Sequence, residues 1–165
     1  METVHFNGIE CHTYGNLPKV GDTAPAFSLV DTGLKEVTEK DFPGKKIVLN
    51  IFPSLDTPVC ATSVRKFNME AGEKKNAAVL CISMDLPFAM QRFCTANDIK
   101  NVVPLSAFRS PKFSQEYGVQ LIDGPLAGLL ARAVVILDEN ANVIYRELVD
   151  EITKEPDYEA ALKML

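Results

Sequence analysis

Runs of apolar residues alternate along the chain with segments whose apolar positions recur at helical spacing. KKIVLNIF, residues 45–52, and AAVLCISM, residues 77–84, are continuous aliphatic runs typical of strands that are buried on both faces. Each run precedes a predicted helix, the first over 59–75 with its end near Gly72 and the second over 87–97. The pattern therefore predicts two successive strand–helix units.

The rest of the chain continues this alternation. The pattern predicts a weaker strand over 102–108, a short helix over 110–117 with Ser110 as its N-cap, a strand pair over 131–150 around a turn at 139–142, and a closing helix over 156–165. Strands that alternate with helices favour parallel pairs, and the late strand pair adds an antiparallel edge.

The predicted fold class is α/β, with a central mixed sheet flanked by helices in the thioredoxin-like pattern. Short alternating stretches broken by glycine and asparagine predict a β-hairpin over 3–18, so we expect an N-terminal hairpin extension over 1–18. At 165 residues, 47% of them hydrophobic, the chain is expected to form a single domain over 1–165.

Charge and hydropathy argue against a nucleic-acid-binding protein and against a membrane protein. The net charge of −5 is spread along the chain, with no basic block that could neutralise a row of phosphates, so we expect no nucleic-acid partner. No apolar stretch approaches the roughly 20 residues of a membrane helix. The start METVHFNGIE has no signal-peptide pattern, and we expect a cytoplasmic protein without membrane association.

Four cysteines, at positions 11, 60, 81 and 94, form no CxxC pair. No histidine lies at a regular metal-ligand spacing from them, so we expect no metal site. In a reducing compartment structural disulfides are also unexpected. Each cysteine therefore has to be judged by its own position.

The segment PSLDTPVC, residues 53–60, lies between the first buried strand and the first long helix. Thr57 suits the N-cap, Pro58 suits the first helical position, and Cys60 then falls in the first turn. Unpaired backbone N–H groups and the helix dipole favour a thiolate there, so Cys60 is a candidate nucleophile. The alternative is that Cys60 is a small apolar residue that packs at a helix start.

Pro53, Thr57 and Cys60 match the PxxxTxxC motif of the peroxiredoxin superfamily. The chain resembles its bacterial thiol peroxidase family of atypical 2-Cys peroxiredoxins, and the likeness covers nearly the whole chain. The segments that carry it are VLNIFPSLDTPVCATSVRKFN, VLCISMDLPFAMQRFC, DGPLAGLLARAVVILDENANVI and LVDEITKEPDYEAAL.

The resemblance implies a thiol-specific peroxidase that reduces hydrogen peroxide and organic hydroperoxides without a cofactor. Cys60 would be the peroxidatic cysteine, Thr57 would hold the peroxide, Pro53 would shield the pocket, and Arg132 would complete the site. Cys94 would be the resolving cysteine, forming an intramolecular disulfide that thioredoxin reduces. Family likeness also suggests a homodimer.

Two of these residues have a second interpretation. Arg132 precedes an apolar strand, where an unpaired charge is costly to bury, so it either faces Cys60 or reaches solvent at the strand end. Cys94 lies one turn after Met90 and could instead be a core residue of the second helix.

Other side chains receive structural interpretations. Cys81 lies in mid-strand and is interpreted as inert core packing, and Cys11 has no assigned role. Phe52 and Phe88 are the phenylalanines expected at the rim of the active site. His5 and His12 both fall in the hairpin, where each is interpreted as a surface or edge residue.

Two rival functions remain open. One is a thiol-disulfide oxidoreductase on the same fold, against which the absence of CxxC counts. The other is a peroxide-sensing redox switch, in which Cys60 oxidation is the signal and turnover is incidental.

Overall fold

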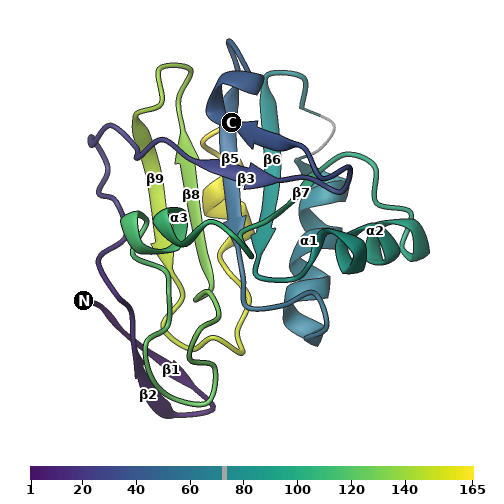
Figure 1. Ribbon diagram of the computed structural model, residues 1–165. Coiled ribbons are helices and arrows are strands. Elements are labelled where there is room, and N and C mark those ends of the chain that lie inside the picture. Colours follow the sequence, from purple (N-terminus) through teal and green to yellow (C-terminus); the bar gives the residue numbers. More distant parts are fainter. Residues whose placement is uncertain (72–73) are drawn as a thin grey trace.

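A mixed β-sheet forms the centre of the molecule in the computed structural model, which describes residues 1–71 and 74–165 (Figure 1). Within these residues the sheet contains seven strands in the order β4-β3-β7-β6-β5-β8-β9. The strands are β3 (Ser28–Val30), β4 (Glu36–Thr38), β5 (Lys46–Ile51), β6 (Ala77–Ser83), β7 (Val103–Ser106), β8 (Ala133–Leu137) and β9 (Val143–Leu148).

Parallel pairing is confined to the middle of the sheet. Strands β5, β6 and β7 run parallel to one another, as expected for strands connected through helices. The pairs β5–β8, β8–β9, β3–β7 and β3–β4 are antiparallel. The predicted mixed sheet with an antiparallel edge is confirmed.

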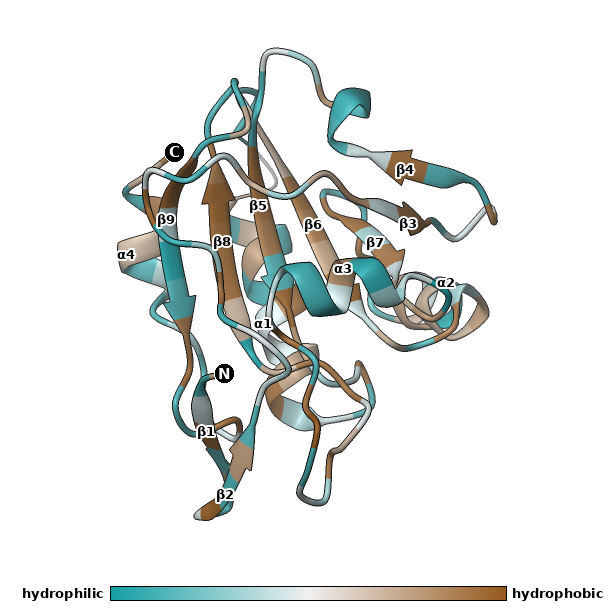
Figure 2. Ribbon diagram, turned by 60° about the vertical axis from the view of Figure 1, so that its left-hand side comes forward, coloured by the Kyte–Doolittle hydropathy of each residue, from teal (hydrophilic) through white to brown (hydrophobic). Residues whose placement is uncertain are grey.

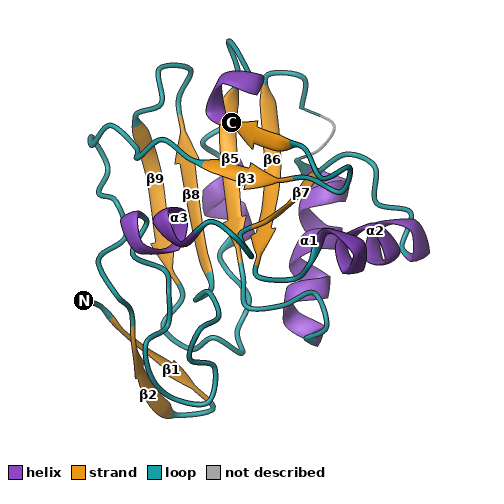
Figure 3. Ribbon diagram, in the orientation of Figure 1, coloured by secondary structure: helices purple, strands orange, loops and turns teal. Residues whose placement is uncertain are grey.

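Helices cover both faces of this sheet. They are α1 (Pro58–Glu70), α2 (Pro87–Ala96), α3 (Pro111–Glu116) and α4 (Tyr158–Leu162). The α3 residue Phe113 packs in one core cluster with Leu49, while residues of α1, α2 and α4 pack in a second cluster with Val48. Figure 3 shows α3 crossing in front of the strands, and Figure 2 shows how hydrophobic the central strands are. Alternate side chains of β5 thus serve opposite cores.

The N-terminal hairpin forms a separate sheet. Strands β1 (Thr3–Phe6) and β2 (Ile9–His12) pair antiparallel. Val4 and Cys11 are buried in a third cluster with Leu121 and Ile152, so the hairpin packs against loops at one end of the main sheet. The backbone of His5 exchanges hydrogen bonds with this loop, donating to Asp150 O at 2.6 Å and accepting from Ile152 N at 2.8 Å.

Some predicted element boundaries are wrong. Helix α1 ends at Glu70 instead of residue 75, and the expected end near Gly72 lies outside the described residues. The closing helix α4 is shorter than 156–165. Ser110 does occupy the N-cap of α3, but its hydroxyl donates to Ser28 O at 2.8 Å and does not cap the helix.

The sequence pattern missed strands β3 and β4 and the short 3-10 helix η1 (Glu39–Asp41) that follows them. Each element is only three residues long, too short to show a hydrophobic period. Their pairing with each other and with β7 depends on tertiary contact. Among the described helices, none has the length and hydropathy needed to cross a membrane.

The His12 side chain connects the hairpin to the loop around Asp123. Its Nδ1 lies 2.6 Å from Asp123 Oδ2, and its Nε2 lies 3.0 Å from Glu10 Oε1. The hydrogen bond with Asp123 raises the pKa of His12, and the same bond lowers the pKa of Asp123. His5 similarly lies 2.9 Å from Asp150. The predicted edge location of both histidines is right, but each has an acidic partner.

We predict that the His12–Asp123 pair makes the stability of the protein depend on pH. The stabilisation from His12 is complete below its unfolded pKa of about 6.5 and is lost as pH rises through its higher folded pKa. Asp123 also contributes stabilisation, but with the opposite pH dependence: it is lost as pH falls through its lowered pKa. The loss of unfolding free energy in His12→Gln should therefore be greater at pH 5 than at pH 9 in urea titrations. Asp123→Asn should show the same trend, and equal losses at both pH values would contradict the prediction.

Candidate active site

The start of α1 is built as the sequence predicts. Thr57 occupies the N-cap in an extended conformation, with φ −97° and ψ 143°, as expected for a residue that precedes proline. Pro58 takes the first helical position and Cys60 falls in the first turn. The first helical hydrogen bond runs from Ala61 N to Thr57 O at 3.0 Å. Cys60 is thus fixed where backbone N–H groups have no helical partner.

Thr57 occupies the predicted N-cap position, but its side chain does not cap the helix. Its hydroxyl donates to Ser54 O at 3.0 Å and makes no cap hydrogen bond. The backbone N–H of Thr57 also donates to Ser54 O, at 3.2 Å. Because the hydroxyl proton is used in this way, the Thr57 oxygen retains lone pairs that can accept a hydrogen bond.

Arg132 lies directly against Cys60. Its Nη2 is 3.1 Å from the Cys60 sulfur, and the two residues are 2% and 0% exposed. The alternative in which Arg132 reaches solvent is therefore wrong. Its Nε donates to Ile152 O at 2.8 Å, and no described residue accepts a hydrogen bond from its Nη1. The contact is a hydrogen bond from a charged donor to the sulfur, the stronger kind of hydrogen bond.

A pocket of about 230 Å³ adjoins Arg132, although Cys60 itself is fully buried and does not line it. Pro53, Thr57 and Arg132 all line it, so the structure brings these three predicted site residues together. Much of the remaining wall is apolar and comes from Phe6, Leu126 and Ile152. Pro53 is buried and has no N–H group that could compete for a bound oxygen.

The predicted rim residues are wrong. Phe52 is fully buried and packs in the core beneath α1, because it follows Val48 and Asn50 on the same side of the β5 segment. Phe88 is 69% exposed on α2, and neither phenylalanine lines the pocket. The aromatic wall is Phe6, which the hairpin brings in from the far end of the sequence. No local pattern in the sequence indicates that contact.

The other three cysteines lie in different surroundings. All four cysteines are free thiols, with Cys94 half-buried on α2 and both Cys81 and Cys11 buried. Burial raises the pKa of Cys94 and of Cys11, and it raises the pKa of Cys81 to about 12. These three groups are therefore protonated at neutral pH. The interpretation of Cys81 as a buried strand residue is confirmed.

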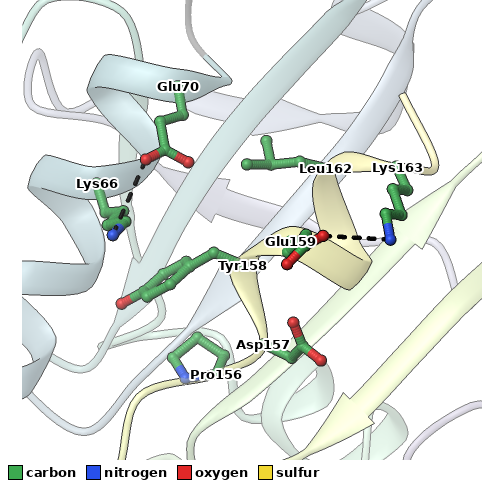
Figure 4. Close-up of a pocket in the computed structure, with 8 residues that line it drawn as sticks. All are labelled: Lys66, Glu70, Pro156, Asp157, Tyr158, Glu159, Leu162 and Lys163. Atoms are coloured by element: carbon green, nitrogen blue, oxygen red, sulfur yellow. Dashed lines mark ion pairs between the residues drawn. The ribbon is translucent and has the colours of Figure 1, made fainter.

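A larger pocket lies elsewhere, between α1 and α4 (Figure 4). Its volume is about 570 Å³, and its lining includes the ion pairs Lys66–Glu70 at 3.9 Å and Lys163–Glu159 at 3.3 Å. None of the predicted site residues lines this pocket, so size does not identify the candidate site here. Within residues 1–71 and 74–165, no group of three or more His, Cys, Asp or Glu residues is arranged to hold a metal ion.

Known proteins resemble this arrangement over the whole chain. The Redoxin family matches residues 19–162. A thiol peroxidase from Corynebacterium glutamicum is 59% identical over 100% of this chain and 99% of its own, and one from Mycobacterium bovis is 53% identical with the same coverage. The chain belongs to the redoxin family, among its thiol peroxidases.

Solved structures share the fold of this redoxin. A peroxiredoxin-like protein from Aquifex aeolicus superposes with a TM-score of 0.94 at 40% identity, over 99% of this chain and 95% of its own. A thiol peroxidase from Chromobacterium violaceum gives 0.88 at 23% identity, over 98% and 94%, and supports the fold alone. The predicted thioredoxin-like fold with an N-terminal hairpin is confirmed.

We predict that Arg132→Met slows the oxidation of Cys60 by peroxide by about 10²-fold, the typical cost of one lost electrostatic donor. The rate is measured as loss of the alkylatable Cys60 thiol in a rapid quench. Arg146→Met is the matched control, because Arg146 pairs with Glu2 at 2.7 Å and does not line the pocket. Equal rates in parent and Arg132→Met would contradict the role of Arg132.

Proposed function

We propose that Cys60 is the peroxidatic residue of this thiol-dependent peroxidase, which reduces hydrogen peroxide and alkyl or lipid hydroperoxides. The observation that carries the proposal is the 3.1 Å contact between the Cys60 sulfur and Arg132, a residue that also lines a small pocket. Among the four cysteines, Cys60 is the one whose sulfur receives a hydrogen bond from a guanidinium. The apolar part of the wall suits the carbon chain of an organic hydroperoxide.

Arg132 and Thr57 have unused hydrogen-bonding capacity that suits a hydroperoxide group. Arg132 Nη1 can donate to the peroxide oxygens, and Thr57 Oγ1 can accept from the peroxide O–H. The Cys60 thiolate then attacks the terminal oxygen and the O–O bond breaks. The sulfur becomes a sulfenic acid, and the departing alkoxide or hydroxide takes a proton to leave as alcohol or water. Arg132 stabilises the charge on the leaving oxygen.

Cys94 is proposed to resolve this intermediate. Its thiol attacks the sulfenic sulfur of Cys60, which forms a disulfide and releases water. Reduced thioredoxin then transfers two electrons and two protons, which restores both thiols and leaves thioredoxin oxidised. The cycle uses no metal or organic cofactor. We also propose that the enzyme is a homodimer in the cytoplasm.

Two alternatives make different predictions. A thiol-disulfide oxidoreductase attacks with one sulfur and resolves with a neighbour three residues away, but Thr57 occupies that position here. A peroxide sensor would oxidise Cys60 once and keep the oxidised form for a partner protein. Only the peroxidase sustains turnover when thioredoxin, thioredoxin reductase and NADPH are supplied.

We predict that Cys60→Ser abolishes NADPH oxidation in this coupled assay, because the hydroxyl is a far weaker nucleophile than a thiolate. Cys81→Ser and Cys81→Ala should retain turnover within about twofold, although loss of the buried thiol costs some stability. A comparable loss of activity in Cys60 and Cys81 variants would mean that the nucleophile is misassigned. In the parent protein, NADPH oxidation that stops after one equivalent of peroxide would favour the sensor.

We expect disulfide formation to require movement of the two helices. Cys60 is held in the first turn of α1 and Cys94 near the end of α2, whereas a disulfide needs α-carbons within about 7 Å. We therefore expect oxidation to unwind the start of α1, the segment around Cys94, or both. Such segments come from the less stable parts of a fold.

Hydrogen exchange on the reduced and oxidised protein tests this movement. We predict that protection falls over residues 57–63 and 90–97 on oxidation, while β5 at residues 47–51 stays protected. The Cys94→Ser variant is the control, because it can form the sulfenic acid but not the disulfide. Unchanged protection in both segments of the parent would show that the cysteines are already poised to bond.

A further inference from the structure

Asp85 lies at the junction between the two segments that carry Cys60 and Cys94. It follows β6 and directly precedes Leu86, the N-cap of α2. Its Oδ1 accepts a hydrogen bond from Ser54 Oγ at 2.8 Å, and its Oδ2 accepts one from Leu55 N at 2.7 Å. Both donors belong to the loop before α1. One carboxylate therefore joins the loop that leads to Cys60 with the start of the helix that carries Cys94.

Buried serines fix Asp85 to the sheet. Ser83 Oγ donates to Asp85 Oδ2 at 2.6 Å, and Ser106 Oγ donates to the Asp85 carbonyl. Ser83 and Ser106 are both fully buried and are register partners at the ends of β6 and β7. Since buried hydroxyls need partners, Asp85 satisfies two groups that the core would otherwise leave unpaired. Asp85 is thus fixed to the ends of β6 and β7 independently of its contacts with the loop.

A series of hydrogen bonds leads from Asp85 through Ser54 to Thr57. The Ser54 hydroxyl accepts from Asp56 N at 3.1 Å, and the Ser54 carbonyl accepts from the hydroxyl and the N–H of Thr57. Fixing Ser54 therefore fixes Thr57, which is both the N-cap of α1 and a wall of the peroxide pocket. Neither Asp85 nor Ser54 lines that pocket.

We propose that Asp85 is a positioning residue that latches the loop before α1 in the geometry that reacts with peroxide, and that opening of this latch lets Cys60 reach Cys94. This inference rests on the proposed function. The closed latch favours attack of the Cys60 thiolate on the peroxide. The open latch favours the second step, in which the Cys94 thiol bonds to the Cys60 sulfenic sulfur and water is released.

The test is Asp85→Asn in the full chain, with the two chemical steps measured separately. The first step is followed as loss of the alkylatable Cys60 thiol in a rapid quench, and the second as appearance of the disulfide after one equivalent of peroxide. Asn keeps the size of the side chain but loses its charge. We expect the first step to slow about tenfold, the typical effect of one lost hydrogen bond to a charged group. The second step should become faster, and excess peroxide should convert less Cys60 to sulfinic acid.

Asp138→Asn is the matched control, because the Asp138 carboxylate likewise accepts several hydrogen bonds in a turn, here from the backbone N–H groups of Asn140 and Asn142. It should lower the melting temperature without changing either step. If Asp85→Asn slows both steps, or lowers only the melting temperature, the latch is disproved. Should that variant fail to fold, Ser54→Ala decides by the same opposite changes in the two rates. Full turnover by Cys60→Ser would instead overturn the proposed function itself.

Discussion

Burial of one guanidinium is the constraint around which the reactive end of this molecule is built. Arg132 is only 2% exposed, and an uncompensated charge at that depth would be strongly destabilising. Two groups compensate it: the Cys60 sulfur at 3.1 Å and the Ile152 carbonyl at 2.8 Å. The contact with Cys60 requires α1 to begin where it does. The contact with Ile152 requires the loop that exchanges backbone hydrogen bonds with His5 of the hairpin. Arg132 also lines the pocket, and its Nη1 has no hydrogen-bond partner among the described residues.

The same packing that prepares Cys60 for peroxide opposes the next step of the proposed cycle. Cys60 is fully buried in the first turn of α1, while Cys94 lies half-buried on another helix. In the proposed cycle, one rigid arrangement does not serve both the orientation of a hydroperoxide and the formation of a bond between the two sulfurs. Polar contacts at the ends of the strands are suited to such a change, because they can break without opening the apolar core. Asp85, which joins both helices to the sheet, occupies that location.

Long apolar runs made the main elements predictable. The runs that became β5 and β6 are buried on both faces, and a buried parallel strand shows a continuous aliphatic sequence whatever its neighbours are. Strands β3 and β4 gave no such signal, because three residues at a sheet edge are stabilised by pairing rather than by their own pattern. The end of α1 and the length of α4 were misplaced for a related reason: contacts with other elements, not the local period, decide where a helix ends.

The sequence by itself determined where the candidate nucleophile Cys60 lies and its immediate setting. Thr57, Pro58 and Cys60 are neighbours in the chain, so proline geometry and the helix start place the sulfur without help from distant residues. Tertiary structure alone decided that Arg132 faces Cys60 instead of solvent. It also decided that Phe6 lines the pocket instead of Phe52 or Phe88. The hydrogen bonds of Asp85 to the loop before α1 are a third such contact. Each of these contacts joins residues at least 30 positions apart. Such contacts leave no local period or turn signal in the sequence, because they arise only when the strands pair and bring their ends together.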